Sequence, residues 1–280
     1  MGFVTKLINN PSFKGLLVLW LVAVLVFLAI AGPYWDMQSI LETPEKISGY
    51  SLFGCILFLG FFRVRKHLSV FSLIKARWWF AAHTIGGLLA LALYIFHVES
   101  LWPQGTGYVQ LLAGLMILVT VSGCLGYLIE KIFPKRLTQQ EDEILYSQVP
   151  EAIYQIKTEA ENLMLEVNKS IGSETLSRHY IETLQWFFQK PRFKLSHIFG
   201  SRSAEHWLSQ QFSTVERYLD ENEKKYSEKL EQLARKKLAV DNSYAVQTVM
   251  KTWLLFHVPL SAALILMSLW HLLLVNIYVV

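Results

Sequence analysis

The sequence predicts an all-α integral membrane protein with five transmembrane helices and a helical soluble insert between the fourth and the fifth. The chain has 280 residues, of which 53% are hydrophobic and only 17% are charged, and its mean hydropathy is +0.33. A soluble domain could not bury that much apolar surface. The apolar residues come in blocks of membrane-spanning length, and lysine and arginine collect on alternate sides of successive blocks.

The predicted spans follow one another along the chain. The first, at about residues 15–32, is interpreted as an uncleaved anchor, because its apolar core is long and the Ala31-Gly32-Pro33 exit is a poor cleavage site. We expect a loop at 33–48 and further spans at about 49–62, 77–98, 108–129 and 253–280. These spans divide the chain into transmembrane helices 1–4 (residues 1–133), the insert (134–252) and transmembrane helix 5 (253–280).

The distribution of cations predicts an orientation. Lysine and arginine lie before the first span, between the second and third, and after the fourth, whereas the loop at 99–107 has none. The positive-inside rule then places the N-terminus and the insert in the cytoplasm and the C-terminus outside. The third and fifth helices are therefore expected to be parallel.

The insert is predicted to be helical and polar. It opens with an acidic helical stretch, and we expect a break near 168–172, a helix at 174–189, a turn at Lys190-Pro191 and a long amphipathic helix at about 204–240. No cysteine, aspartate or glutamate stands at ligand spacing from its histidines, so these are interpreted as surface or structural residues, together with one in the basic loop: His179, His197, His206 and His67. The insert is interpreted as a docking platform.

Two of the predicted spans carry histidines in pairs. His83 and His97 are fourteen residues apart, and so are His257 and His271. A step of fourteen in an α-helix returns to within roughly 40° of the starting direction and rises about 21 Å. His83 follows Arg77 by six residues, and His257 follows Lys251 by six. In parallel helices the four imidazoles therefore lie at two matching depths.

Metal coordination explains these two pairs better than the alternatives. A single intramembrane histidine can serve as an interhelical hydrogen-bonding residue or in a proton relay. Equal spacing and equal depth in two helices favour ligation, with each Nε2 binding iron and each Nδ1–H donating to a carbonyl or hydroxyl. The chain has two cysteines, Cys55 and Cys124, and no CxxCH motif for covalent attachment. The expected cofactors are thus two b haems, with metal ligands His83, His257, His97 and His271.

Three neighbouring residues are assigned to cofactor binding. Gly86 and Gly87 lie on the face of His83, where a missing side chain admits a porphyrin plane or, alternatively, close helix packing. Arg77 would lie near the edge of the cytoplasmic haem and pair with a propionate, although the topology also requires cations there. Tryptophan and tyrosine at span ends, Trp253 among them, are explained by an interfacial belt.

The two His-x13-His helices resemble those of the di-haem membrane cytochromes b, a class that includes respiratory b-type cytochromes and ferric-reductase-like membrane domains. The insert and last span resemble more closely a bacterial cytochrome b-like membrane subunit, through the stretches FPKRLT (133–138), FFQKPRF (187–193), ERYLDENE (216–223) and WLLFHVPLSAALILMSLWHLLLVNIY (253–278). The resemblance implies a multi-pass protein of the bacterial inner membrane that accompanies multihaem c-type cytochromes or flavin/iron–sulfur subunits. Unlike respiratory cytochrome b, the chain lacks a second large membrane half and a recognisable quinol-site motif.

The expected function is transmembrane electron transfer by a bis-histidine di-haem b cytochrome, one membrane subunit of an oxidoreductase complex. Its partners would be membrane lipid, a cytoplasmic or quinone partner and a periplasmic c-type cytochrome, with no nucleic acid. The chain has no phosphate-cradling glycine loop, GxGxxG motif or cysteine cluster, so a self-sufficient enzyme is not expected. The alternative is a haem-free membrane scaffold or transporter whose histidines relay protons or bind a metal.

Overall fold

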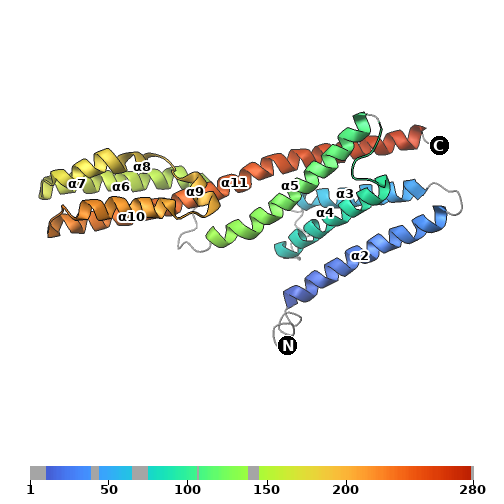
Figure 1. Cartoon of the computed structure of the whole chain (residues 1–280), viewed down its shortest axis with the longest axis horizontal. Coiled ribbons are helices and arrows are strands. Elements are labelled where there is room, and N and C mark those ends of the chain that lie inside the picture. The colour runs from blue at the N-terminus through green and yellow to red at the C-terminus, as the bar shows by residue number, and fades with distance from the viewer. Residues whose placement is uncertain (1–10, 39–43, 65–74, 106, 138–144, 279–280) are drawn as a thin grey trace. The chain divides into compact units, whose positions relative to one another are not determined.

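The computed structural model describes residues 11–38, 44–64, 75–105, 107–137 and 145–278. Every regular element in these ranges is a helix, which confirms the all-α class (Figure 1). The chain divides into two compact units, Met1–Leu128 with Trp253–Val280, and Ile129–Thr252. Each unit is described by itself.

The described part of the chain has five helices that are long and apolar enough to cross a membrane. Four of them belong mainly to the first unit: α2 (Pro11–Gln38), α3 (Pro44–Val64), α4 (Ala76–Val98) and α5 (Gly107–Leu137). The fifth, α11 (Glu221–Tyr278), has 58 residues. At 1.5 Å per residue it is about 87 Å long, far more than the ~30 Å of a bilayer core. Only its apolar end, from Trp253 onward, therefore has the composition and length of a span.

Contacts within the first unit show that α3 runs antiparallel to its neighbour α4. Ser48, near the start of α3, hydrogen-bonds His97 near the end of α4, and Phe62, near the end of α3, packs on His83 near the start of α4. Tyr34, late in α2, packs on Phe96 of α4, so α2 and α4 are parallel.

The last span runs in the same direction as α4. Trp253 of α11 donates to the carbonyl of Ser122 in α5, and Tyr108 of α5 donates to the carbonyl of Met267 in α11, so α5 and α11 are antiparallel. Tyr50, near the start of α3, donates to Asn276 near the end of α11, and Gly60, near the end of α3, lies beside Ile265. Helix α11 is therefore antiparallel to α3, as α4 is, and so runs parallel to α4.

The two sides of the first unit are packed differently. Helices α2, α3 and α4 approach one another closely along their backbones. In the described residues, the backbones of α5 and of the last span come close to other helices at only a few points. These two helices contact their neighbours mainly through side chains. One buried cluster joins α4, α5 and α11, formed by Ala90, Tyr94, Ala113, Met116 and Leu264.

Three predicted boundaries were wrong. Helices take up most of the loop expected at 33–48, because α2 continues through Pro33 to Gln38 and α3 begins at Pro44. Tyr34 is buried against Phe96 and its hydroxyl donates to Glu99 at 3.1 Å, which favours one more helical turn over an exit at the proline. The fourth predicted span ends at 129, whereas α5 continues to Leu137.

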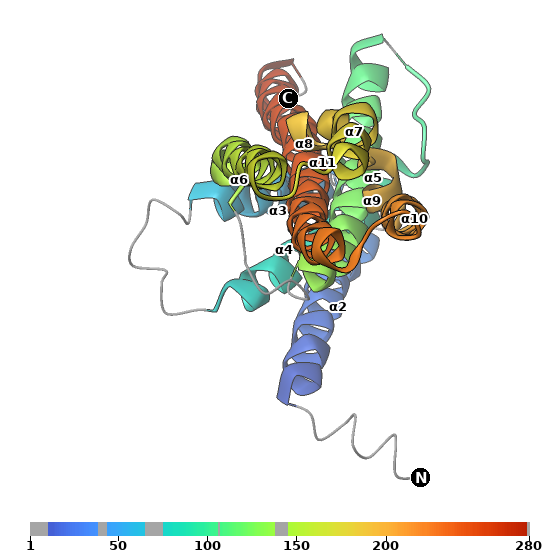
Figure 2. The same ribbon diagram turned by 90° about the vertical axis from the view of Figure 1, so that its left-hand side faces the viewer.

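The second unit is a helical domain around one apolar core, to which α11 contributes its N-terminal part (Figure 2). Its other elements are a 3₁₀ turn (Tyr146–Gln148), α6 (Val149–Ser170), α7 (Glu174–His179), a π-helical turn (Tyr180–Leu184), α8 (Gln185–Gln189), α9 (Lys194–Phe199) and α10 (Ser203–Glu216). The break near 168–172 is confirmed, with Gly172 in a left-handed conformation (φ 68°) after α6. The turn at Lys190-Pro191 is confirmed as well.

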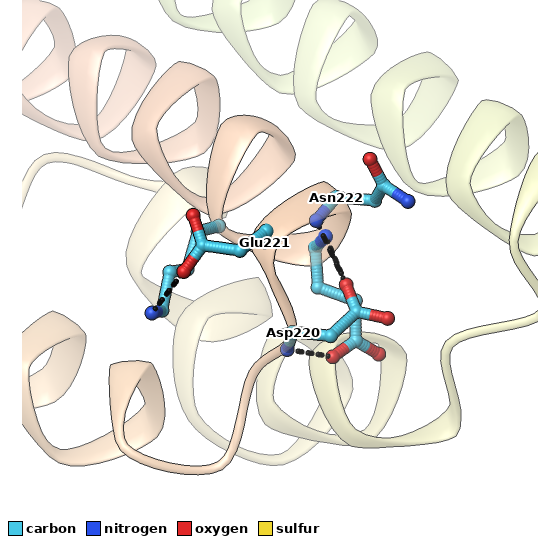
Figure 3. Close-up of polar contacts among 5 residues, drawn as sticks. Asp220, Glu221 and Asn222 are labelled. Atoms are coloured by element: carbon cyan, nitrogen blue, oxygen red, sulfur yellow. Dashed lines mark hydrogen bonds and ion pairs between the residues drawn. The ribbon is translucent and has the colours of Figure 1, made fainter.

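The long helix predicted at 204–240 was wrong, because α10 and α11 are separate helices (Figure 3). Asp220 caps the start of α11: its carboxylate accepts from the backbone N–H of Asn222 and of Glu223, at 2.9 and 2.7 Å. Glu223 returns a hydrogen bond to the N–H of Asp220 at 2.8 Å, which completes a capping box. The helix then continues without interruption into the last span, so the insert and the last span share one element.

The histidines of the second unit differ in environment. His206 is exposed, His179 is half-buried, and His197 is buried with 9% of its surface exposed. Burial, together with the nearby positive charge of Lys237, lowers the pKa of His197 to about 4. His197 is therefore neutral in the folded unit over the whole range in which an ordinary histidine gains a proton.

This difference predicts an acid-sensitive stability. Between pH 6.5 and 4 the unfolded chain protonates His197 and the folded chain does not, so the histidine destabilises the folded unit as pH falls through that window. Between these two pH values we expect the free energy of unfolding of wild type to fall by up to about 3 kcal/mol relative to that of His197→Gln. Urea unfolding of the full chain in detergent, followed by the fluorescence of the Trp186–Trp207 pair, measures it. The free energy of unfolding of His206→Gln, at an exposed site, should depend on pH as that of wild type does. If the free energy of unfolding of His197→Gln also changed with pH in parallel with wild type, the lowered pKa of His197 would be wrong.

Candidate functional site

The histidines of α4 and α11 form a candidate site with two levels. The rings of His83 and His257 lie with their centres 6.4 Å apart and their planes at 80°. Fourteen residues further along each helix, His97 and His271 are close enough to interact electrostatically. Each level thus takes one histidine from α4 and one from α11, and all four are partly shielded from solvent.

The spacing of His83 and His257 suits a shared metal ion. A metal–imidazole bond is about 2 Å long, and two imidazoles bound on opposite sides of one ion have ring centres about 6.3 Å apart. The observed separation is 6.4 Å. The separation of the two ring centres is therefore the one that a shared metal ion would require.

A hydrogen bond to α3 fixes the tautomer of His97. The buried Ser48 hydroxyl donates its proton to the carbonyl of Glu45 at 3.0 Å. It therefore accepts from Nδ1–H of His97, 2.9 Å away. This leaves the lone pair of a neutral His97 on Nε2, the atom that a bound metal would need. A methyl group on Gly49 would approach Cε1 of His97 to 3.1 Å, so the glycine gives the ring its room.

His257 is held from two sides. Its Nδ1 is 3.1 Å from the hydroxyl of Ser122 in α5, and its ring stacks on Trp253 one turn earlier in α11, with centres 5.1 Å apart and planes at 20°. The indole N–H of Trp253 donates to the carbonyl of Ser122 at 2.8 Å. Serine and tryptophan together orient the imidazole.

The other two histidines have mainly apolar surroundings. His83 packs on Phe62, with ring centres 4.7 Å apart, in a small pocket that Phe58 and Trp79 also line. Its Nδ1 is buried without a hydrogen bond of normal geometry, although the backbone of Leu59 lies close to the ring. His271 stacks on Tyr108 of α5, with centres 6.1 Å apart.

The two glycines near His83 have different surroundings. A Cβ on Gly86 would approach Leu59 of α3 to 3.0 Å, and its carbonyl accepts from Cys55, so Gly86 serves close packing of α3 and α4. A Cβ on Gly87 would meet no atom within 4 Å, so no other described helix packs closely on this glycine.

The cation assigned to propionate binding lies away from these contacts. Arg77 is exposed, and its guanidinium lies 5.2 Å from the ring centre of Trp78. Two other cations of the same basic loop, Arg65 and Lys66, lie outside the described residues. The structure therefore gives Arg77 a cation–π contact in its own helix.

An apolar layer separates the two histidine levels. Ala90 lies seven residues from both histidines of α4, and Leu264 lies seven residues from both histidines of α11. Both are buried in the cluster that also contains Met116 of α5. The hydroxyl in this cluster, that of Tyr94, donates to the carbonyl of Leu101 at 3.0 Å. The layer excludes water between the levels.

Sequence reasoning missed the residues that orient the imidazoles: Ser48, Gly49, Ser122 and, as a stacking residue, Trp253. Ser48, Gly49 and Ser122 come from α3 and α5, and no spacing within α4 or α11 indicates them. Trp253 and His257 are four residues apart in one helix, a spacing at which side chains meet, so this contact had a signal.

The described residues contain no group of three or more histidine, cysteine, aspartate or glutamate side chains arranged to hold a metal ion. The candidate site instead holds its histidines in two pairs. An all-helical protein with apolar helices of membrane-spanning length and paired histidines on two of them is the class that fold and site define. The chain matches no protein-family model, no curated protein and no solved structure.

Proposed function

We propose that the protein is a bis-histidine di-haem b membrane cytochrome, a subunit that carries electrons across the bilayer within a larger oxidoreductase complex. The observation that carries this proposal is the spacing of His83 and His257, 6.4 Å between ring centres. Haem b, when bound, supplies reversible one-electron chemistry. His83 with His257 would hold one haem and His97 with His271 the other.

The residues of the two levels suit electron transfer. If both imidazoles of one level bound the same iron, no position would remain open for oxygen or substrate. Ser48 accepts from the Nδ1 of His97, which leaves Nε2 for a metal, and Ser122 contacts the Nδ1 of His257. A metal-bound histidine typically donates its other N–H to such an acceptor.

The haem-free alternative needs a polar route between the levels. A proton relay from one histidine level to the other would have to cross the layer of Ala90, Met116 and Leu264, whose side chains carry no proton to donate and no basic group. The hydroxyl of Tyr94 is engaged by a backbone carbonyl. The apolar layer favours electron transfer over proton transfer.

The partners and the location follow from the same proposal. With the N-terminus and insert in the cytoplasm of a bacterial inner membrane, one level faces a cytoplasmic or quinone partner. The other level faces a periplasmic c-type cytochrome, and flavin/iron–sulfur proteins are candidates for the cytoplasmic side. Neither partner is needed for the first test.

Haem content tests the proposal directly. Protein purified from haem-replete cells is expected to contain two b haems per chain by pyridine haemochromogen assay, with a low-spin spectrum on reduction. Bis-histidine ligation is the reason for the low-spin state. A colourless preparation that takes up no added haem would refute the di-haem assignment and leave the scaffold or transporter.

The serine beside His97 gives a finer test. Ser48→Ala removes the acceptor of Nδ1–H, so we expect haem affinity at that level to fall about 10–100-fold, with the other haem retained. The haem content that remains after dilution into an excess of a haem-free, haem-binding protein measures this affinity. The matched control is Thr120→Ala in α5, whose hydroxyl donates to its own helix at 2.8 Å, and it should keep both haems. Equal retention in the two variants would contradict the role of Ser48.

A further inference from the structure

A cationic segment surrounds α9 in the second unit. Residues 183–204 contain no aspartate or glutamate and four lysine or arginine residues: Lys190, Arg192, Lys194 and Arg202. This differs from the rest of the insert, in which acidic residues are frequent from its acidic first stretch onward. The segment therefore favours anionic partners.

Two large apolar side chains project from the same segment. Leu195 and Phe199 are 70% and 78% exposed, and they are four residues apart on α9, so they share one face. Cationic residues lie on both sides of them in the sequence. An apolar face flanked by lysine and arginine is typical of helices that lie in the interface of a membrane.

The core of the unit fixes how α9 is presented. Phe193 precedes α9 in a left-handed conformation (φ 54°), which is unfavourable for a side chain other than glycine. Its ring is held between Trp186 and Trp207, with centres 6.2 and 5.3 Å away. Gly200 ends the helix at φ 67°. Packing therefore keeps Leu195 and Phe199 in the solvent-facing position.

The segment lies at the end of the unit where α11 leaves toward Trp253, opposite the turn between α10 and α11 (Figure 1). Nζ of Lys194 is 4.9 Å from the ring centre of Tyr244 in α11. A second lysine, Lys251, contacts the same tyrosine stack at 3.7 Å from Tyr146.

We propose that α9 is a membrane-surface contact. Leu195 and Phe199 enter the boundary between headgroups and acyl chains, and Lys194 and Arg202 pair with anionic phospholipid headgroups. An anionic phospholipid surface offers negative headgroups and acyl chains together, which matches the lysine, arginine and apolar side chains of this segment, whereas a protein partner would have to supply an acidic and an apolar surface side by side. This inference goes beyond electron transfer and does not depend on the histidines.

Depth measurement on the full chain tests the inference. In a Cys55→Ala, Cys124→Ala background, a spin label is attached at Phe199→Cys or, as the control, at Tyr218→Cys. Tyr218 is 74% exposed in the turn between α10 and α11. In nanodiscs with about 30% anionic lipid, the ratio of oxygen to nickel-complex accessibility at position 199 should be at least about fivefold that at position 218.

Removing the cations separates their contribution to membrane contact from that of the apolar side chains. Lys194→Gln with Arg202→Gln should bring the label at 199 toward the water-like value of position 218, as should neutral lipid alone. Circular dichroism checks that the variants stay folded. A label at 199 as accessible to the nickel complex as that at 218 in anionic nanodiscs would overturn the inference. So would burial of the label only after a soluble protein is added.

Discussion

Replacing His97 with alanine is expected to remove one haem per chain and to leave the other in place. His97 shares its level with His271, whereas His83 and His257 form the other pair with ring centres 6.4 Å apart. The two levels are separated by a buried layer that contains Ala90 and Leu264. Loss of one axial ligand should therefore stay local, and haem content should fall from two per chain to about one.

Three variants make this result specific to the pairing. His271→Ala should give the same residual spectrum as His97→Ala, and His83→Ala should remove the other haem and leave the complementary spectrum. The exposed His206 of the second unit provides a control, since His206→Ala should keep both haems. If His97→Ala loses neither haem, or both, the pairing by level is wrong.

Lys237→Met is expected to destabilise the second unit by about 3–5 kcal/mol. The side chain of Lys237 is fully buried, and its ammonium donates to the carboxylate of Asp241 at 2.6 Å and to the carbonyl of Lys190 at 2.7 Å. The ring of Phe187 lies 4.1 Å below the ammonium. Without Lys237, the carboxylate of Asp241 stays in the core and loses its countercharge.

The pH dependence of this loss follows from Asp241. Burial raises the pKa of Asp241 to about 6 even with Lys237 beside it. Removal of the cation raises that pKa further, so as pH falls the carboxyl of the variant takes up its proton before that of wild type does. The difference in stability between variant and wild type therefore shrinks as pH falls toward about 6 and stays constant below it. Urea unfolding of the full chain in detergent at two pH values measures both effects.

Two further variants identify the cause. Arg235→Met removes an exposed partner of Glu231 on the same helix and should cost no more than about 1 kcal/mol. Lys237→Met combined with Asp241→Leu removes both buried charges and should recover part of the loss. The backbone N–H of Arg192, which donates to Asp241 at 3.0 Å, then remains unpaired and limits the recovery. An equal loss in Lys237→Met and Arg235→Met would contradict the buried pair.

The features that could be predicted depend on periodicity along one helix. Apolar length identified the helices that suit a membrane, and a step of fourteen placed His83 and His97 on one face. The turn at Lys190-Pro191 and the end of α6 at Gly172 had local signals. Proline and glycine restrict the backbone whatever surrounds them, so such signals persist in the folded protein.

The features that could not be predicted depend on contacts between helices. Ser48 and Ser122 approach the imidazoles only because α3 and α5 pack where they do. The extension of α2 past Pro33 depends on the contact of Tyr34 with Phe96. The break before α11 is different, because Asp220 and Glu223 have the spacing of a capping box and the signal was overlooked.

The apolar layer of Ala90, Met116 and Leu264 has a consequence for energetics. In the described residues the side chains of this layer carry no group that can take up and release a proton. Under the proposed function, an electron that passes from one level to the other would therefore move net negative charge through the low-dielectric part of the bilayer. Full passage of one charge across the membrane is worth about 2.3 kcal/mol per 100 mV. The rate and direction of such a transfer would therefore respond to membrane voltage, and uncouplers that collapse the voltage would alter the steady-state reduction of the two haems in opposite senses.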